Sequence, residues 1–201
     1  MADMKIPQSM PKQLLLKLGT DMEMTLDPVA SGGVCFYSLN LLGHALINRR
    51  AAKALYDEMQ RKKHACDVLV AAEAKAIGLI QELAMLLGHD HYVILRKSRK
   101  AYMVDPLVTT VKSITTTSEQ QLILDRQDMA LLEGRTACFV DDVISTGATY
   151  IAAQNLYRKA TGREFAFCAC VATEGAALEN NPDGYIRLGH LPLYDAAGNL
   201  I

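Results

Sequence analysis

Short apolar runs and longer amphipathic stretches alternate along the chain, and this alternation predicts strands separated by helices. Five apolar runs predict buried strands, at residues 67–72, 91–95, 121–124, 137–140 and 165–172. Apolar positions spaced three and four apart predict helices before and between them, at residues 38–62, 75–87, 128–132 and 150–160. Because helical crossovers connect parallel strands, we expect an α/β fold with a doubly wound parallel sheet.

The segment 137–149 combines acidic and small polar residues in an order that suits a phosphate and a sugar. Asp141 and Asp142 follow the apolar run, and a loop of small residues from Ser145 to Thr149 leads directly into the next helix. Free backbone N–H groups at a helix start attract an anion. The carboxylates can accept hydrogen bonds from ribose hydroxyls or help hold a hydrated divalent cation. The segment therefore predicts a phosphate-sugar site beyond the end of a strand, where doubly wound sheets bind ligands.

Two polar segments outside this motif are further candidates for a ligand site. Residues 96–100 place four cations within five positions, a density that suits a polyphosphate. Residues 109–121 are rich in threonine, serine and glutamine. A structureless polar segment of this length inside a compact domain indicates a lid or an arm rather than packing material.

Composition narrows the class of protein. The formal net charge is −1, so the chain lacks the basic surplus that nucleic-acid-binding proteins carry. No apolar run approaches the length of a membrane span, and the first 17 residues lack the pattern of a secretory signal. The cysteines have no metal-ligand spacing, so we expect buried thiols in a reducing, cytoplasmic environment. We therefore expect one domain, residues 1–201, with neither nucleic-acid nor membrane partners.

The thirteen positions 137–149 resemble the phosphoribosyl pyrophosphate (PRPP) motif of the type I phosphoribosyltransferases, and the chain is most similar to their xanthine and adenine branches. This resemblance implies a small hood over the sheet and a flexible lid loop. It also implies transfer of a 5-phosphoribosyl group from PRPP to a purine base, xanthine or adenine, in purine salvage. Mg²⁺ as cofactor and a homodimer are implied in the same way.

The resemblance also assigns roles to residues. Binding of the 5′-phosphate falls to Ser145, Thr146, Gly147, Ala148 and Thr149. The ribose contacts fall to Asp141 and Asp142, which are also implied as catalytic residues and as indirect ligands of the metal through water or PRPP. Pyrophosphate binding falls to Ala72, Glu73, Ala74, Lys75, Ala76, Arg96, Lys97 and Lys100. The lid contributes Glu119 as a further catalytic contact, and Glu174 is implied in base binding.

The chain departs from the family pattern at two places. Lys75-Ala76 stands where adenine enzymes carry Arg-Gly, and lysine lacks the planar fork of arginine. Gly175 stands where xanthine enzymes carry a lysine that contacts the purine, which leaves the base unassigned. We expect residues 1–64 to form an N-terminal arm, hood and helix, residues 65–176 the PRPP-binding core, and residues 177–201 a C-terminal segment.

Three alternatives remain open at this stage. One is a non-catalytic regulator that senses PRPP on the same fold. Another is a phosphoribosyltransferase for a different base, such as orotate or uracil. The third is a Rossmann-type nucleotide binder, although the segment after the first core strand, residues 73–78, does not fit the glycine fingerprint of that class.

Overall fold

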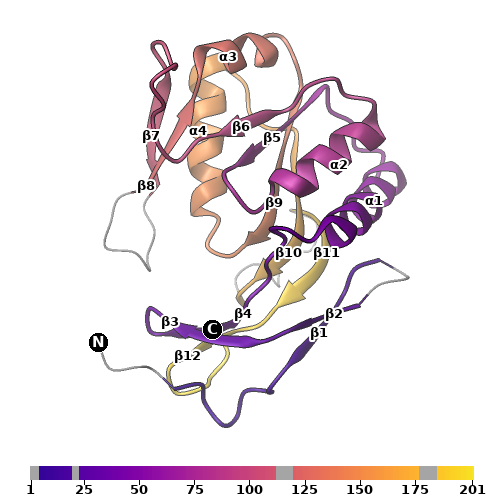
Figure 1. Cartoon of the computed structure of the whole chain (residues 1–201), viewed down its shortest axis with the longest axis vertical. Coiled ribbons are helices and arrows are strands. Elements are labelled where there is room, and N and C mark those ends of the chain that lie inside the picture. The colour runs from indigo at the N-terminus through magenta and orange to yellow at the C-terminus, as the bar shows by residue number, and fades with distance from the viewer. Residues whose placement is uncertain (1–4, 20–22, 112–119, 177–184) are drawn as a thin grey trace.

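A computed structural model gives the structure of the protein, described at residues 5–19, 23–111, 120–176 and 185–201. Its centre is a sheet of five parallel strands in the order β11-β10-β9-β5-β6 (Figure 1). The strands are β5 (Val68–Ala72), β6 (Val93–Leu95), β9 (Ala137–Ile144), β10 (Phe167–Glu174) and β11 (Ile186–Leu191). The predicted α/β class with a parallel sheet is therefore confirmed.

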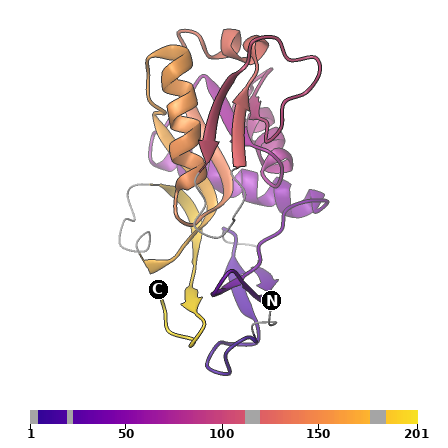
Figure 2. The same ribbon diagram turned by 90° about the vertical axis from the view of Figure 1, so that its left-hand side faces the viewer.

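Helices cover both faces of this sheet (Figures 1 and 2). One face carries α1 (Ala45–Arg61) and α2 (Ile77–Leu87), and the other carries α3 (Arg126–Leu132) and α4 (Ala148–Thr161). Successive strand residues point to opposite faces, so Phe139 packs in the core beneath α4 while Val140 packs in the core beneath α1 and α2. This two-sided burial explains why the core strands read as continuous apolar runs.

A hairpin lies beside α4. It consists of β7 (Leu107–Val111) and β8 (Gln120–Leu124), which pair antiparallel. Reciprocal backbone hydrogen bonds between Arg96 and Ile123, of 2.9 and 2.8 Å, fasten the hairpin to the end of β6. The strand expected at 121–124 therefore exists, but it belongs to this hairpin and not to the parallel sheet. The lid was predicted at 109–121, but residues 109–111 belong to β7 and residues 120–121 belong to β8, so these two ends are not structureless. The rest of the predicted lid, 112–119 with Glu119, lies outside the described residues.

Two small antiparallel sheets lie beyond the ends of β10 and β11, at the bottom of Figure 1, and we call them the hood. Their strands are β1 (Leu14–Lys17), β2 (Glu23–Leu26), β3 (Pro28–Ser31), β4 (Val34–Tyr37) and β12 (Leu193–Asp195). Close packing joins the hood to the core, because a Cβ at Gly189 of β11 would come within 2.5 Å of the Leu16 side chain. Both ends of the chain thus contribute to the hood.

Residues 38–44, which we call the hood linker, connect β4 to α1. The apolar spacing predicted a helix from residue 38, but α1 begins at Ala45. Gly43 has a φ of +77°, which interrupts helical geometry, and the Asn48 side chain donates to the carbonyl of Leu41 at 2.7 Å. Asn48 also occupies the space beside Gly78, where a Cβ would lie 2.9 Å from its amide, so a glycine lets α2 approach α1.

The cysteines, the absence of a membrane span and the C-terminal segment are three further expectations that the structure bears on. The five cysteines are free thiols, four of them buried and Cys66 partly exposed. Within the described ranges, no helix combines the length and the apolar character that a membrane crossing requires. The C-terminal segment expected at 177–201 contains β11, which joins the core sheet, and β12, which joins the hood.

Candidate active site

The loop between β9 and α4 forms a small cavity. Its volume is about 150 Å³, and its lining includes Asp141 and the whole run from Ser145 to Thr149. Gly147 is the N-cap of α4 with a φ of +74°, a left-handed conformation that glycine adopts at little cost. The N–H groups of the first turn of a helix have no partners within the helix. The cavity therefore presents backbone donors and the positive end of a helix dipole, an arrangement suited to a phosphate.

Aromatic packing fixes the start of α4. Tyr150 lies 5.7 Å from Phe139 and 6.2 Å from Phe165, measured between ring centroids. Burial raises the pKa of Tyr150 to about 12, so its hydroxyl stays protonated at neutral pH. Tyr150 also lines the cavity, together with Val111 and Gln120 of the hairpin. The sequence motif ended at Thr149 and left out Tyr150, whereas Val111 and Gln120 lie within the polar segment 109–121 that the sequence had indicated as a candidate for a ligand site.

The two motif carboxylates have different surroundings. Asp141 lines the cavity, and its Oδ1 accepts a hydrogen bond of 2.9 Å from the backbone N–H of Asp142. Burial raises the pKa of the Asp141 carboxyl well above its usual value, and the charge of Asp142 raises it further. The Asp142 side chain is almost buried, and its Oδ2 lies 3.6 Å from the ammonium of Lys75 without any hydrogen-bond partner among the described residues. Asp142 therefore offers an oxygen that a ligand can use.

The segment after β5 is held by an ion pair from a distant part of the chain. The Glu73 carboxylate lies 2.9 Å from Nε of Arg96, and it accepts a 2.8 Å hydrogen bond from the backbone N–H of Lys97. The Glu73–Ala74 peptide bond is cis. The N-cap of α2 is Ala76, which provides no side-chain cap. The N–H of Ile77 donates to the carbonyl of Ala74 at 3.2 Å, which leaves the following N–H groups of the first turn for a ligand. Residues 73–76 thus form a second anion-binding candidate, which we call the β5–α2 loop.

Lys75 and Glu174 connect this loop to the phosphate side. The ammonium of Lys75 donates to the carbonyl of Leu39 in the hood linker at 3.1 Å, in addition to its pairing with Asp142. Burial raises the pKa of Glu174, while a hydrogen bond with Ser145 and the charge of Lys75 act in the opposite direction. Glu174 is therefore close to both loops, at the end of β10 that faces the hood.

Most of the predicted site residues thus meet at one edge of the sheet. The three cations predicted from the basic segment, Arg96, Lys97 and Lys100, differ in what their side chains contact. Arg96 is engaged by Glu73, and the charge of Lys97 acts on Asp141. The ammonium of Lys100 donates to the hydroxyl of Ser98 at 2.8 Å. The contact of Leu39 with Lys75 was not predicted, because nothing in local sequence signals a backbone carbonyl as a partner.

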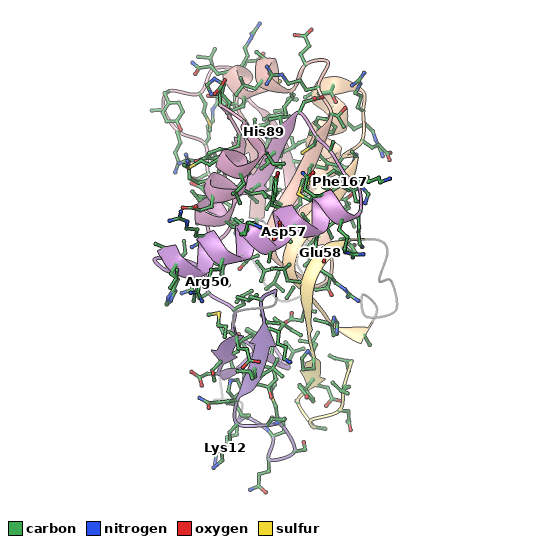
Figure 3. The ribbon with its side chains drawn as sticks, turned by 90° about the vertical axis from the view of Figure 1, so that its right-hand side faces the viewer. Lys12, Arg50, Asp57, Glu58, His89 and Phe167 are labelled. Atoms are coloured by element: carbon green, nitrogen blue, oxygen red, sulfur yellow. The ribbon has the colours of Figure 1, made fainter. Side chains whose placement is uncertain are left out.

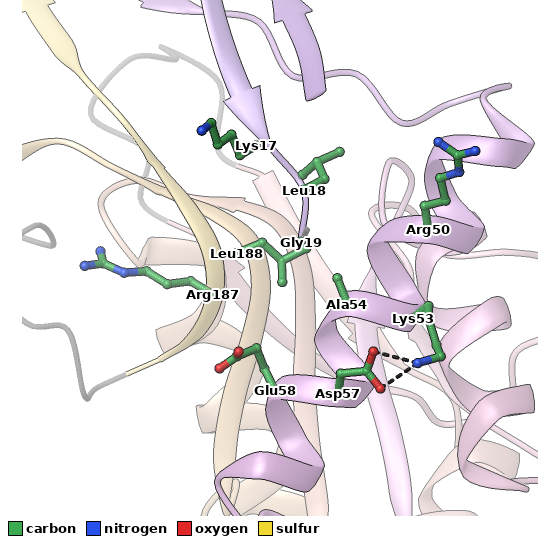
Figure 4. A pocket seen from close by; sticks show the side chains of 10 residues that line it. All are labelled: Lys17, Leu18, Gly19, Arg50, Lys53, Ala54, Asp57, Glu58, Arg187 and Leu188. Carbon is green, nitrogen blue, oxygen red and sulfur yellow. Dashed lines mark hydrogen bonds and ion pairs between the residues drawn. The ribbon is translucent and has the colours of Figure 1, made fainter. Parts of the chain in front are cut away.

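A larger cavity, of about 420 Å³, lies elsewhere, between α1, the end of β1 and β11 (Figure 4). Its lining contains none of the predicted site residues. The charges that α1 contributes to it are largely paired locally, Lys53 with Asp57 and Glu58 with Arg61. Figure 3 shows Asp57 and Glu58 on α1, which runs across this side of the molecule. The chemistry suggested by the sequence therefore belongs to the smaller cavity and not to the larger one.

Comparisons with known proteins identify the family of the chain. The sequence model of the family described as phosphoribosyl transferase domain matches residues 39–189. A hypoxanthine/guanine phosphoribosyltransferase of Methanotorris igneus is 32% identical over 167 residues, which cover 82% of this chain and 81% of that protein. A protein of the same name from a Methanocaldococcus species is 35% identical over 121 residues, which cover 59% of this chain and 57% of that one.

Solved structures show the same fold. The adenine phosphoribosyltransferase of Rhodothermus marinus aligns with a TM-score of 0.63 at 23% identity, covering 82% of this chain and 93% of that one. The enzyme of Giardia lamblia, solved with 9-deazaadenine, gives a TM-score of 0.63 at 18% identity and the same coverage. The family match extends from the hood linker through both loops and the acidic pair to β11. The chain therefore belongs to the phosphoribosyltransferase family and is a phosphoribosyltransferase.

Proposed function

We propose that the protein transfers the 5-phosphoribosyl group of PRPP to a ring nitrogen of a purine base. The bond between C1′ and the pyrophosphate oxygen breaks, a bond from C1′ to the purine nitrogen forms, and that nitrogen loses its proton. The products are a nucleoside monophosphate and pyrophosphate. The observation that carries this proposal is the cavity at residues 145–149, where a helix start and Asp141 offer partners for a phosphate and an adjoining sugar.

Positioning and electrostatics supply the catalysis in this proposal. The loop from Ser145 to Thr149 binds the 5′-phosphate, and Asp141 and Asp142 bind the ribose hydroxyls. Positive charge develops at C1′ in a transition state that resembles an oxocarbenium ion, and carboxylates held nearby stabilise it. The Oδ2 of Asp142 supports its role as an acceptor, because this buried oxygen is paired with Lys75 but accepts no hydrogen bond within the described structure, and such an oxygen gains from a ligand hydroxyl.

The pyrophosphate binds at the other loop in this proposal. The backbone of residues 72–76 donates to it, and Lys97 and Lys100 add positive charge. Arg96 supports this loop through Glu73, from which its guanidinium is 2.9 Å away. Its first role is thus to hold the loop in place.

Mg²⁺ is the metal that we propose for the reaction, and the donor set suits it only in part. Carboxylate oxygens such as those of Asp141 and Asp142 are ligands that Mg²⁺ accepts. Within the described part of the chain, however, no group of three or more histidine, cysteine or acidic residues gathers as a complete metal site. The residues present therefore fit a cation held mainly by the substrate and touched by the acidic pair through water. Such a cation would neutralise charge on the departing pyrophosphate.

The identity of the purine acceptor and the residue that contacts it are further parts of the proposal. The sequence favoured xanthine or adenine, and the similar proteins of Methanotorris and Methanocaldococcus are named for hypoxanthine and guanine. Glu174, between the two loops and facing the hood, is the residue that we propose to contact the base. Free, mostly buried thiols support a reducing compartment, and we propose the cytoplasm as the location of this purine salvage step.

A homodimer is also part of the proposal. Apolar side chains are exposed on α1, on α2 and in the segment after β6, where 60% of Leu46, 67% of Met85 and 68% of Val104 are accessible. Burying such side chains against a second copy would be favourable. Light scattering should give twice the monomer mass, and Met85→Glu should lower it.

The decisive experiment measures pyrophosphate release from PRPP and Mg²⁺ with adenine, hypoxanthine, guanine, xanthine, orotate and uracil, each offered separately. Release with one or more purines, and with neither pyrimidine, is the expected result. Release with orotate or uracil alone would overturn the choice of a purine. Calorimetric binding of PRPP without release from any of the six bases would favour a regulator that senses PRPP.

A further inference from the structure

The Lys75 side chain contacts two groups that lie outside both anion-binding loops, the Asp142 carboxylate and the Leu39 carbonyl. Its ammonium lies 3.6 Å from Oδ2 of Asp142 and 3.1 Å from the carbonyl oxygen of Leu39. These partners belong to two elements that are remote from Lys75 in sequence, β9 and the hood linker. One side chain of the β5–α2 loop thus touches both the acidic pair and the hood.

The buried Asp142 carboxylate is stabilised by its ion pair with Lys75. Its side chain is 10% exposed, and its Oδ2 has no hydrogen-bond partner within the described structure. Removing a carboxylate from water is costly unless a counter-charge compensates. Lys75 provides the ion pair that the structure shows for Asp142. Loss of the ammonium would therefore leave Asp142 uncompensated and favour a different side-chain position.

The hood linker depends on the same ammonium. Asn48 of α1 binds the carbonyl of Leu41 at 2.7 Å, and Lys75 binds the carbonyl of Leu39 at 3.1 Å. Both leucines are almost completely buried, so the backbone groups of the linker need partners within the protein. Of these two side chains, only Lys75 also reaches the acidic pair. The position of the hood and the position of Asp142 are thus coupled through Lys75.

We infer that Lys75 is a positioning residue, which joins the hood to the acidic pair and thereby aligns the base with the ribose. This inference rests on the proposed function for its catalytic meaning. It also changes the role expected for Lys75, whose side chain serves Asp142 and Leu39 while the backbone of the loop faces the pyrophosphate. The consequence is that one substitution should disturb the binding of two different substrates.

The test compares Lys75→Met with Lys97→Met, which removes a cation on the pyrophosphate side, and with Lys53→Met, which removes an exposed cation on α1. Lys75→Met should raise KM for both PRPP and the purine by about tenfold, the size of a lost charge-assisted hydrogen bond. Lys97→Met should raise KM for PRPP alone, and Lys53→Met should change neither. Lys75→Arg keeps a charged donor and should restore KM for the purine to within about twofold of the wild-type value.

Hydrogen exchange of the unliganded protein tests the structural part independently of turnover. The amides of Ser38, Leu42 and His44 are hydrogen-bonded, so a peptide covering the linker reports its order. Lys75→Met should speed exchange there, and Lys97→Met should not. A KM effect confined to PRPP, with unchanged exchange in the linker, would show that Lys75 is an ordinary pyrophosphate ligand. If the wild-type protein used no purine, the proposed function would fail, and faster exchange in Lys75→Met would still support the coupling.

Discussion

The two anion-binding loops of this protein are built in different ways. The loop at 145–149 is continuous in sequence, and its cavity is formed mainly by neighbouring residues, the start of α4 and Asp141. The β5–α2 loop is held by partners far away, since Glu73 binds Arg96 and Lys97, and Lys75 binds Leu39. A local motif fixes the first loop, whereas the second depends on tertiary contacts. Substitutions should therefore act locally at the first loop and at a distance at the second.

The largest expected effect tests the acidic pair that lies between the two loops. Asp142→Asn and Asp141→Asn should each lower turnover about 100-fold, the loss typical for one preorganised electrostatic group. Steady-state kinetics with PRPP and the preferred purine measure this effect, and thermal unfolding checks the fold. Asp57→Asn is the control, because it breaks an exposed ion pair on α1 that contributes little. Full activity in both variants would remove the ribose assignment.

The next prediction compares two glycines of α4 to separate an effect on PRPP binding from an effect on the free energy of unfolding. Gly147 and Gly162 lie at opposite ends of α4, with φ values of +74° and +72° and open space at both Cβ positions. Alanine at either position should lower the free energy of unfolding by about 1 kcal/mol, the cost of a left-handed residue with a side chain. Only Gly147→Ala should weaken PRPP binding, by about tenfold, in a calorimetric titration. Equal PRPP affinity in both variants would mean that the 145–149 loop does not bind the phosphate.

A smaller effect is expected when the ion pair between Glu73 and Arg96, which holds the β5–α2 loop, is removed. Glu73→Gln keeps a hydrogen-bond acceptor for Lys97 but removes the charge that holds Arg96. KM for PRPP should rise about fivefold, consistent with loss of a partly buried ion pair of about 1 kcal/mol, while KM for the purine stays unchanged. The matched control is Glu58→Gln, which breaks the exposed pair with Arg61. A change in purine affinity alone would contradict the role given to Glu73.

The smallest effect concerns stability. Burial and the charge of Asp142 raise the pKa of the Asp141 carboxyl, so above the ordinary carboxyl pKa of about 3.9 the unfolded chain loses this proton first. The native state then binds more protons, and its stability falls as pH rises towards the folded-state pKa. Asp141→Asn should therefore raise Tm at neutral pH by about 2 °C, while it lowers turnover.

The control for the gain in Tm of Asp141→Asn is the same comparison with the wild-type protein at lower pH. The gain in Tm should shrink as the pH is lowered towards the ordinary carboxyl value, because Asp141 is then protonated in both states. Thermal unfolding at a series of pH values measures it. A gain that does not depend on pH would show that the side chain is stabilised for reasons other than its charge.

Sequence alone determined the parts of this protein that depend on neighbouring residues. Four strands of the parallel sheet, β5, β6, β9 and β10, follow from the apolar runs, and the segment 137–149 carries the strand, the acids and the helix start together. The cation density of residues 96–100 marked the basic segment after β6, and the resemblance to the phosphoribosyltransferases added Glu73 and Lys75 to the candidate residues. Local patterns of this kind are legible because adjacent residues meet whatever the rest of the chain does.

Only the tertiary structure decided how the remaining pieces meet. Pairing of β11 with β10, the start of α1 at Ala45, and the use of the Leu39 carbonyl by Lys75 all depend on residues brought together from distant parts of the chain. Backbone carbonyls carry no signature in the sequence, and a hood built from both ends of the chain has no single periodic pattern. Its position follows from burial and close packing, as at Gly189 and Leu16, which are properties of the folded chain as a whole.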